Sequence, residues 1–310
     1  MGIISFSDSE ARAQLVAEAL EDVESEEGDG ADPNKPYIFQ DKMRESTLVA
    51  GFRNLYETRL LFDVTLTVGE KSFPCHRAFL AASSEYFRCM FTTDLAERDM
   101  TNISISGVDA KSMELVLKYL YTGQVELTSE VVQSLLSCAN LYQLWDLKDG
   151  CADFIERKID YENCIGIHFF AQAHGCRDLE LQAWNVIIES FEAVTESPEF
   201  LELTSDNLLE VIKYDDIQAS EEEVFEAVVR WFDHKPEERS QHINLIMQFV
   251  RFWLLDEHYI FDKVKTCPLV QSEPQIKAVV DEVIQYKLLK DRWIETDLYV
   301  EPRYGADYCR

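Results

Sequence analysis

The sequence predicts an α+β domain followed by an all-α domain of stacked helix pairs. Alternation of apolar and polar residues, typical of half-buried strands, is confined to three segments in the first half of the chain, Val64–Val68, Ser72–Cys75 and Asn102–Ser106. From about Glu156 onward the apolar residues recur at helical spacing instead. A chain of 310 residues is also long enough to bury two cores. We therefore expect one domain over residues 37–155 and a second over 156–288.

The first 36 residues are acidic. They hold ten Asp and Glu residues against only Arg12 and Lys35. Ser7 and Glu10 have the spacing of a capping box for one short helix. The stretch after that helix has the composition of a flexible linker. We expect residues 1–36 to be a mostly disordered acidic leader with one short helix.

The first domain is predicted to begin with an extended segment and a helix. The extended segment covers Tyr37–Lys42, and apolar residues recur at helical spacing over Ser46–Thr58. The apolar face of this helix consists of Leu48, Phe52, Leu55 and Tyr56. The spacing leaves open whether this face packs on the core of its own chain or against a second chain.

A hairpin and a series of helices complete the first domain. Gly69–Lys71 supplies the tight turn between the first two strands. From His76 to Met90 the apolar spacing is helical. Three more helices are predicted after the third strand, over Ser112–Tyr121, Val131–Tyr142 and Leu144–Ile155. Thr122-Gly123 is the stop signal of the first of these.

The second domain is predicted to be helical throughout. Pro198 directly after Ser197 has the order of an N-cap and a first helical residue. Ser220 with Glu223 forms a second capping box. The helical periods are Cys164–Ala173, Leu179–Phe191, Leu208–Ile212, Glu222–Asp233, Arg239–Phe249, Glu257–Lys265 and Gln275–Leu288. The remaining residues, 289–310, have the composition of a linker-like tail.

Composition argues against several classes of protein. The formal net charge of −29 argues against nucleic-acid binding, which needs clustered Lys and Arg. No apolar run approaches the roughly 20 residues of a membrane-spanning helix, and the N-terminus lacks the features of a secretory signal. We therefore expect the eight Cys residues to be free thiols in a reducing compartment, the cytosol or the nucleus.

Four segments carry a resemblance to a known family. Residues 61–91 (LFDVTLTVGEKSFPCHRAFLAASSEYFRCMF), 108–127 (VDAKSMELVLKYLYTGQVEL) and 131–155 (VVQSLLSCANLYQLWDLKDGCADFI) resemble the BTB (POZ) domain. Residues 221–255 (EEEVFEAVVRWFDHKPEERSQHINLIMQFVRFWLL) resemble the BACK domain that follows BTB in Kelch-like proteins. The order of these segments adds to their specificity.

This resemblance implies an adaptor rather than an enzyme. In the family, the BTB domain forms a dimer, partly by exchange of an N-terminal strand. The same domain binds cullin-3, which makes the protein a substrate-specific adaptor of a cullin-3 RING E3 ubiquitin ligase. The expected partners are cullin-3, a second copy or a related BTB protein, and an unknown ubiquitylation substrate. No cofactor is expected.

The resemblance also assigns residues to the cullin-3 contact. The family's motif is an apolar residue, any residue and then Glu, which Leu95-Ala96-Glu97 matches. We expect Leu95 to fill a pocket on a cullin helix and Glu97 to pair at its rim. Tyr121 aligns with an aromatic position at the same interface, although a core aromatic with a local hydrogen bond fits it equally well. The helix pair over Asn163–Phe191 is expected to complete the groove for an apolar segment of cullin-3.

Dimerisation is assigned by the resemblance to the first helix. In the family this helix packs across a two-fold axis, which makes its apolar face the expected dimer contact, Leu48, Phe52, Leu55 and Tyr56. Asp63, His76 and Arg77 match typical BTB positions. We interpret them as structural, with Asp63 satisfying backbone donors and His76 beginning a helix.

The chain departs from the family in one respect. Kelch-like proteins normally continue into a β-propeller that binds the substrate, and each blade needs a diglycine at a period near 50 residues. No such repeat occurs here, so the substrate cannot be inferred. An alternative function therefore stays open, a non-catalytic oligomeric scaffold or modulator that pairs with full-length Kelch-like relatives.

Two other kinds of chemistry are weighed against the adaptor. Cys164 and His168 share a helical face and precede His174 and Cys176, but no CxxC or HxxxH element accompanies them, so we predict no metal site. Cys75 lies beside His76 and Arg77, which would suit a reactive thiol, although a buried strand-end thiol is the simpler interpretation. No nucleophile-elbow, phosphate-loop, dinucleotide or zinc-protease motif is present, so no catalytic residue is assigned.

Overall fold

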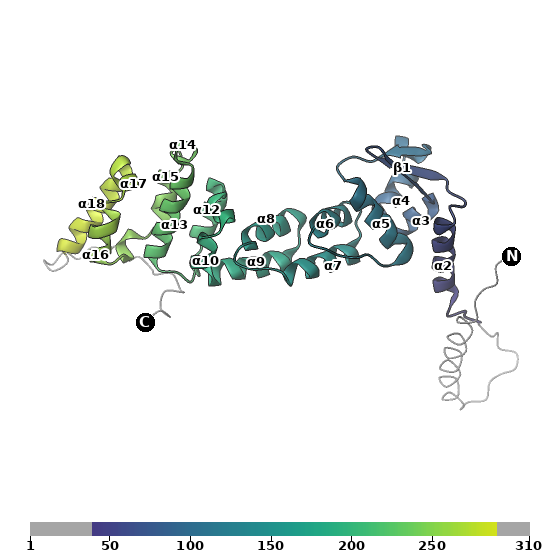
Figure 1. Cartoon of the computed structure of the whole chain (residues 1–310), viewed down its shortest axis with the longest axis horizontal. Coiled ribbons are helices and arrows are strands. Elements are labelled where there is room, and N and C mark those ends of the chain that lie inside the picture. The colour runs from purple at the N-terminus through teal and green to yellow at the C-terminus, as the bar shows by residue number, and fades with distance from the viewer. Residues whose placement is uncertain (1–38, 290–310) are drawn as a thin grey trace, which may run out of the picture. The chain divides into compact units, whose positions relative to one another are not determined.

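The computed structural model describes residues 39–289, and Figure 1 shows the order of its elements along the chain. The predicted leader with its capping box, the tail over 290–310 and the first two residues of the predicted extended segment lie outside the described range. Among the described residues, no helix is both long enough and apolar enough to cross a membrane.

The first domain contains a three-stranded sheet. Its strands are β1 (Val64–Val68), β2 (Lys71–Cys75) and β3 (Asn102–Ser104), in the order β2-β1-β3. β1 pairs antiparallel with β2 and parallel with β3, so that Leu66 lies opposite both Phe73 and Ile103. The three apolar residues of β1 are buried and its two threonines are half-buried, as the alternation predicts. β3 ends two residues earlier than predicted.

The hairpin turn depends on a glycine. Gly69 has a φ of +57°, a conformation that glycine adopts without steric cost. It connects β1 directly to β2, where the sequence predicts a tight turn. A second glycine with positive φ, Gly123 at +71°, ends helix α5, and its N–H donates to the carbonyl of Tyr119 at 2.7 Å. Both turn signals in the sequence are therefore confirmed.

The rest of the first domain is helical. Its helices are α2 (Arg44–Glu57), α3 (Arg77–Ser83), α4 (Glu85–Thr92), α5 (Ala110–Thr122), α6 (Val132–Leu141) and α7 (Trp145–Glu156), with a 3₁₀ turn η1 (Ala96–Arg98) after α4. The predicted helix over Ser46–Thr58 is confirmed as α2, which begins two residues earlier because Asp41 accepts a hydrogen bond from the N–H of Met43 at 3.0 Å. The described part of the predicted extended segment, residues 39–42, forms no strand.

The second domain is helical throughout its described residues. Its α-helices are α8 (Cys164–His174), α9 (Arg177–Glu189), α10 (Phe191–Thr195), α11 (Pro198–Leu201), α12 (Ser205–Ile212), α13 (Glu221–His234), α14 (Pro236–Arg239), α15 (Ile243–Ile246), α16 (Glu257–Tyr259), α17 (Pro268–Ser272) and α18 (Pro274–Leu289). The 3₁₀ turns η2 (Met247–Phe249) and η3 (Phe252–Leu254) and the π turn η4 (Ile260–Val264) connect them.

The N-caps of two helices are confirmed. Ser197 caps α11 with Pro198 as its first residue, and the reciprocal Ser220–Glu223 capping box begins α13. One helical prediction is wrong, because Arg239–Phe249 is not a single helix. Exposed polar residues at 240–242 form a turn, and the guanidinium of Arg239 is bound to carbonyls outside α14, which fixes the end of that helix.

Two hydrophobic cores meet at one helix pair. The first core contains the sheet and helices α3 to α7, and the second contains residues of α10 to α13 and of α15 to α18. Helices α8 and α9 contribute to both. Ile167 and Leu179 belong to the first core, whereas Ile165 and Ile187 belong to the second. The predicted two-domain division thus corresponds to two cores that share α8 and α9.

Candidate functional site

The loop between α4 and β3 presents the predicted contact residues. Leu95 precedes the 3₁₀ turn η1, and its side chain is 52% exposed. Glu97 lies inside the turn and is half-buried. Hydrogen bonds within the loop fold it tightly, from the N–H of Leu95 to the Thr93 carbonyl at 2.8 Å and from the N–H of Arg98 to the Leu95 carbonyl at 3.1 Å. An exposed leucine and a carboxylate two residues later therefore share one short turn.

Two further exposed apolar residues, Leu141 and Trp145, lie on either side of Tyr142 in the sequence, and Tyr142 contacts Tyr86 of α4. Burial, and then the charge of Glu97, raises the pKa of Tyr86. The ring of Tyr86 packs edge-on against Tyr142 with their centroids 5.2 Å apart. Beside Tyr142 in the sequence, Leu141 is 41% exposed and Trp145 is 56% exposed. The exposure of these two residues was not predicted from the sequence, because the apolar spacing of their helices is typical of core elements.

Tyr121 is placed in the core rather than on a surface. Its side chain is fully buried, and its ring is stacked between Tyr56 at 3.9 Å and Phe79 at 4.4 Å. Its hydroxyl oxygen lies 2.9 Å from Nδ1 of His76 and 3.0 Å from the backbone N–H of the same residue. The core alternative left open by the sequence therefore describes its position, and it has no exposed surface for direct contact with a partner.

The four predicted dimer residues do not share one environment. Leu48 is 54% exposed, whereas Phe52, Leu55 and Tyr56 are half-buried. Phe52 packs on Phe79 with ring centroids 5.0 Å apart. The C-terminal half of α2 is fixed by Arg53, which donates to the carbonyls of Tyr121 at 3.3 Å and Thr122 at 2.6 Å. The assignment of these residues to a dimer stays a prediction.

A groove lies where the two cores meet. Its cavity volume is about 420 Å³, and it is lined by residues of α6, α7, α8 and α11, among them Val132, Phe154, Ile167 and Phe170. Lys158 lies at the groove with its ammonium 4.3 Å from the ring centroid of Phe154 and 2.8 Å from the hydroxyl of Ser129. Of the helix pair over Asn163–Phe191, which the resemblance assigned to a cullin-3 groove, α8 lines this groove and α9 does not. Its role in cullin-3 binding stays a prediction.

A glycine and a carboxylate form part of this groove. Oε2 of Glu199 accepts a hydrogen bond from the N–H of Gly166 at 2.9 Å, in the first turn of α8. That N–H has no partner within its own helix, so Glu199 acts as a cap supplied by α11. A Cβ at residue 166 would lie 2.8 Å from Oε1 of Glu199. The absence of a side chain at Gly166 is therefore what lets the carboxylate approach.

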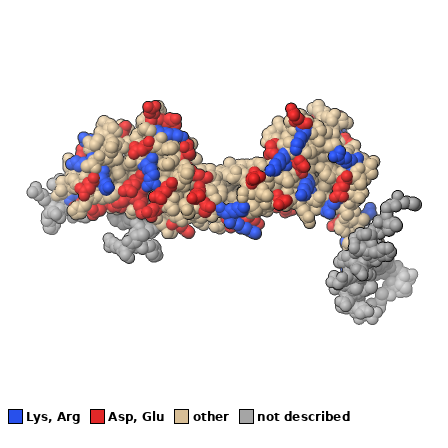
Figure 2. Space-filling view, viewed as in Figure 1, with Lys and Arg blue, Asp and Glu red and all other residues tan. Residues whose placement is uncertain are grey.

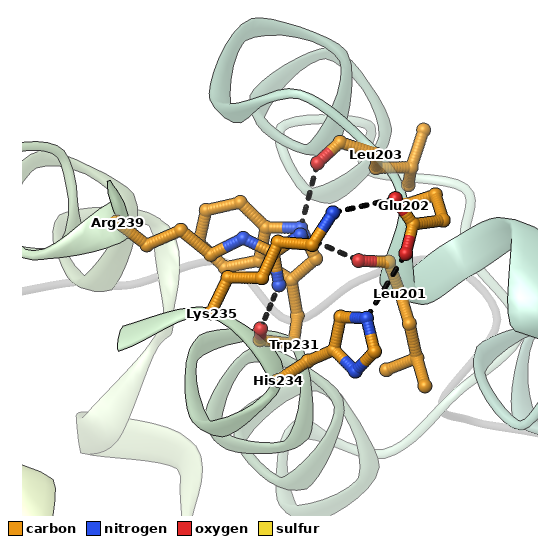
Figure 3. Close-up of polar contacts among 7 residues, drawn as sticks. All are labelled: Leu201, Glu202, Leu203, Trp231, His234, Lys235 and Arg239. Carbon is orange, nitrogen blue, oxygen red and sulfur yellow. Dashed lines mark hydrogen bonds and ion pairs between the residues drawn. The ribbon is translucent and has the colours of Figure 1, made fainter. Parts of the chain in front are cut away.

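The second domain contains a polar cluster around a buried arginine, drawn in Figure 3. The guanidinium of Arg239 lies 4.1 Å from the ring centroid of Trp231 and donates to the carbonyls of Trp231 and Leu201. Nε1 of Trp231 donates to the Leu203 carbonyl at 2.9 Å. Burial lowers the pKa of Arg239. Each of these donors is used to join α11 to α13 and α14, so the cluster has a structural role.

Glu202 lies at the exposed side of the same cluster. Its carboxylate accepts from Nζ of Lys235 at 2.7 Å and lies 3.0 Å from Nε2 of His234 (Figure 3). Hydrogen bonds from Lys235, and then from His234, lower the pKa of Glu202. A carboxylate held ionised by two partners is poorly suited to proton transfer near neutral pH.

The cysteine and histidine candidates are buried, except for the half-buried His174. Burial, and then the charge of Asp63, raises the pKa of Cys75 to about 12, which disfavours the reactive thiolate. Nε2 of His174 lies 2.8 Å from the hydroxyl of Ser137, and Nδ1 of His168 lies 3.3 Å from the Glu180 carbonyl. Within residues 39–289, no three His, Cys, Asp or Glu side chains lie close enough to hold a metal ion.

Asp63 has the structural position that the sequence predicts. Its Oδ1 accepts the backbone N–H of Arg77 at 2.7 Å, which satisfies a donor at the start of α3. His76 immediately precedes α3 and is buried, with Nε2 2.9 Å from the Leu60 carbonyl. The interpretation of both residues as structural is confirmed.

The charge distribution is acidic over the second domain. On the face shown in Figure 2, Asp and Glu side chains outnumber Lys and Arg over α10 to α18. Within the described residues this view shows no extended basic stripe of the kind that binds a phosphate backbone.

Two family models match the chain. The BTB/POZ domain model matches residues 52–159, and the model of the BACK domain, described as "BTB And C-terminal Kelch", matches residues 164–265. The first match covers the sheet and helices α3 to α7, and the second begins at α8. The predicted domain bounds at residues 37, 155 and 288 stay predictions.

Relatives and solved structures are also similar to this chain. It is 38% identical to human Kelch-like protein 6 over 251 residues, 81% of this chain and 40% of that protein. It is 38% identical to human Kelch-like protein 24 over 258 residues, 83% of this chain and 43% of that protein. The solved BTB domains of zebrafish PATZ1 and human Gigaxonin are each 24% identical to this chain, and each match covers 39% of it. The match covers 99% of the PATZ1 structure with a TM-score of 0.36, and 98% of the Gigaxonin structure with a TM-score of 0.34.

The chain spans about two fifths of the length of the Kelch-like relatives that it matches. Its sequence contains no diglycine repeat of the kelch type. The order of the two family models agrees with the two cores of the structure. The protein belongs to the BTB–BACK proteins of the Kelch-like family.

Proposed function

We propose that this protein is a non-catalytic, substrate-specific adaptor of a cullin-3 RING E3 ubiquitin ligase and that it binds cullin-3 directly. The observation that carries the proposal is the exposed Leu95 with Glu97 two residues later, on a turn of the BTB domain. An exposed leucine on a folded turn supplies an apolar anchor, and the adjacent carboxylate supplies a charged contact at the rim of a partner's pocket. The mechanism is positioning, because the adaptor raises the effective concentration of a substrate near the ubiquitin-charged enzyme.

The proposed cullin-3 surface has two parts. The first is the turn at Leu95 and Glu97, together with the exposed side chains of Leu141 and Trp145. The second is the groove lined by Phe154, Ile167 and Phe170, which suits an extended apolar segment. In this proposal Tyr121 contributes indirectly, by supporting α3 and α5 from within the core.

We also propose that the protein pairs with a second copy, or with a related BTB protein, through α2. The exposed side chain of Leu48 supports this proposal, since Met43 and Val49 nearby in the sequence are also exposed. A dimer doubles the number of cullin-3 and substrate sites in one complex. We propose that it acts in the cytosol or the nucleus.

The test is a calorimetric titration of the purified protein with the N-terminal domain of cullin-3. The Leu95→Ala/Glu97→Ala double variant is expected to bind at least about tenfold more weakly, since an anchor residue typically contributes 2 kcal/mol or more. A matched control, Leu245→Ala/Glu237→Ala, removes an exposed leucine and an exposed glutamate from the BACK domain and is expected to bind like wild type. If the folded wild type does not bind, the adaptor is excluded and the oligomeric scaffold or modulator is the remaining function.

A further inference from the structure

The backbone of the turn that carries Leu95 and Glu97 is held by one arginine from another element. Nη1 of Arg77, in α3, donates to the Arg98 carbonyl at 2.7 Å and makes a longer contact with the Glu97 carbonyl at 3.5 Å. Nη2 donates to the Met100 carbonyl at 2.5 Å. The guanidinium also lies over the ring of Phe91, 4.7 Å from its centroid. Arg77 therefore contacts both the end of α4 and the far side of the turn.

The carbonyls of Arg98 and Met100 need a partner, whereas that of Glu97 already accepts the backbone N–H of Met100 at 3.3 Å. The last carbonyls of a helical turn have no donor within the turn, and a cation near them is favourable. Within the described part of the chain, no other side chain donates to the carbonyls of residues 95–100. The turn itself contains no buried residue, so packing contributes little to holding it in place.

We propose that Arg77 is a positioning residue for the partner-contact turn. Its guanidinium fixes the carbonyl side of residues 97–100 and thereby holds Leu95 and Glu97 in the orientation that a partner meets. The planar fork of arginine matters, because it reaches two carbonyls at once, which a lysine ammonium cannot do with the same geometry. The expected effect of Arg77 on binding rests on the proposed cullin-3 function. Its expected effect on the order of the turn rests on the geometry alone.

The arrangement allows the guanidinium to be tested separately from the fold of α3. Asp63 is bound to the backbone N–H of residue 77, not to its side chain. Substitution of the side chain therefore leaves this contact at the start of α3 in place. Lys111 is an exposed cation of the same domain whose Nζ lies 3.8 Å from Glu130, so Lys111→Gln removes the same charge without contact to the turn.

The first measurement is amide hydrogen exchange of residues 94–100 in the full chain without any partner. Arg77→Gln is expected to raise exchange in this turn by about tenfold, because the charged pair of hydrogen bonds is lost. Exchange in α3 and β1 is expected to stay unchanged, and Arg77→Lys is expected to be intermediate. Unchanged exchange of the turn in Arg77→Gln, with Lys111→Gln as the reference, would overturn the proposal whatever the protein binds.

The second measurement is a double-mutant cycle on cullin-3 binding. If Arg77 acts through the turn, Arg77→Gln is expected to weaken binding about tenfold in the wild-type background, mainly through faster dissociation. It is expected to have almost no effect when Leu95 and Glu97 are already alanine. Equal effects in both backgrounds would overturn the positioning role. A wild type that does not bind cullin-3 would remove the proposed function while the exchange result still decides the role of Arg77 in the turn.

Discussion

Tyr121 and His76 form a reciprocal pair of hydrogen bonds although they lie 45 residues apart. Nε2 of His76 faces the Leu60 carbonyl at 2.9 Å, and a carbonyl can only accept, so Nε2 carries the proton. Nδ1 is then an acceptor for the Tyr121 hydroxyl, whose oxygen in turn accepts the backbone N–H of His76. One hydroxyl thus joins the end of α5 to the start of α3.

Removal of this hydroxyl is expected to destabilise the BTB domain. Tyr121→Phe keeps the stacked ring but leaves two buried polar groups of His76 without a partner, which costs about 1–3 kcal/mol. Urea unfolding of the variant measures the loss. Tyr119→Phe, at a half-buried position of the same helix, is the matched control and is expected to change stability by less than about 1 kcal/mol. Equal losses in the two variants would show that the hydroxyl pair is not what stabilises this junction.

The buried Arg239 of the BACK domain is expected to contribute more to the free energy of unfolding than the ion pair beside it. Arg239→Met leaves the carbonyls of Trp231 and Leu201 without their donor, and we expect a loss of about 2–3 kcal/mol. Lys235→Met removes the exposed pair with Glu202 and is expected to cost less than about 1 kcal/mol. Urea unfolding followed by tryptophan fluorescence compares the two. A Lys235 effect as large as that of Arg239 would contradict this ranking.

Gly166→Ala is expected to weaken cullin-3 binding while leaving the free energy of unfolding almost unchanged. Alanine favours the helix by about 1 kcal/mol over glycine, but its Cβ displaces Glu199 and removes the cap on α8, which costs a similar amount. The free energy of unfolding is therefore expected to change by less than about 0.5 kcal/mol. Displaced into the groove, the Glu199 side chain is expected to weaken cullin-3 binding in a calorimetric titration.

The control for this substitution is Glu199→Gln, which keeps an acceptor for the Gly166 N–H and introduces no Cβ at residue 166. It is expected to bind cullin-3 like wild type. Normal binding by Gly166→Ala would indicate that the groove is not part of the interface.

The buried thiols predict how reactivity and stability depend on pH. Burial raises the pKa of Cys75, Cys151 and Cys164 to about 12 and that of Cys138 to about 11. These thiols stay protonated in the folded chain when the unfolded chain ionises near pH 9, so the folded state holds more protons. Their contribution to stability is therefore complete below about pH 9 and is lost as pH rises toward 12.

Mass spectrometry after iodoacetamide treatment of the native protein at pH 8 checks the thiol assignment. We expect modification of the exposed Cys89 and protection of these four thiols until the protein is unfolded. Rapid native modification of Cys75 would restore the reactive-thiol interpretation that its position beside His76 and Arg77 allows.

An exposed residue of α2 offers a test of the dimer. Leu48→Glu places a charge at a position that is already 54% exposed, so the fold is expected to persist. If α2 packs against a second copy, this charge is expected to shift the protein from dimer to monomer in sedimentation velocity. Leu245→Glu, at an exposed position of α15, is the control and is expected to stay a dimer. A Leu48→Glu variant that remains dimeric would place the dimer contact elsewhere.

The sequence was a good guide where one local pattern determines the result. Alternation over Val64–Val68 predicted β1 to the residue, because one face of that strand packs on a core. Ser220 with Glu223 predicted the start of α13 for a similar reason, since both partners of the capping box lie within four residues. The turn with Leu95 and Glu97 was located through the family resemblance and not through spacing.

Features that depend on distant residues could not be predicted. The burial of Tyr121 depends on Tyr56 and Phe79, which precede it by more than forty residues. The hydrogen bonds of Arg77 join its side chain to backbone carbonyls, and such contacts leave no signature in the sequence. The groove at Phe154 and Phe170 forms only when α7 packs near α8 and α11. In the sequence, the apolar spacing that includes these two phenylalanines is equally compatible with a position in the core.

The most direct test of the adaptor proposal is the hydrogen-exchange footprint of the cullin-3 N-terminal domain on the full chain. We expect protection of residues 94–100 and 141–145 and of the amides that line the groove at Phe154, Ile167 and Phe170, with α12 to α18 unchanged. Protection confined to α12–α18, or no protection at saturating cullin-3, would contradict it.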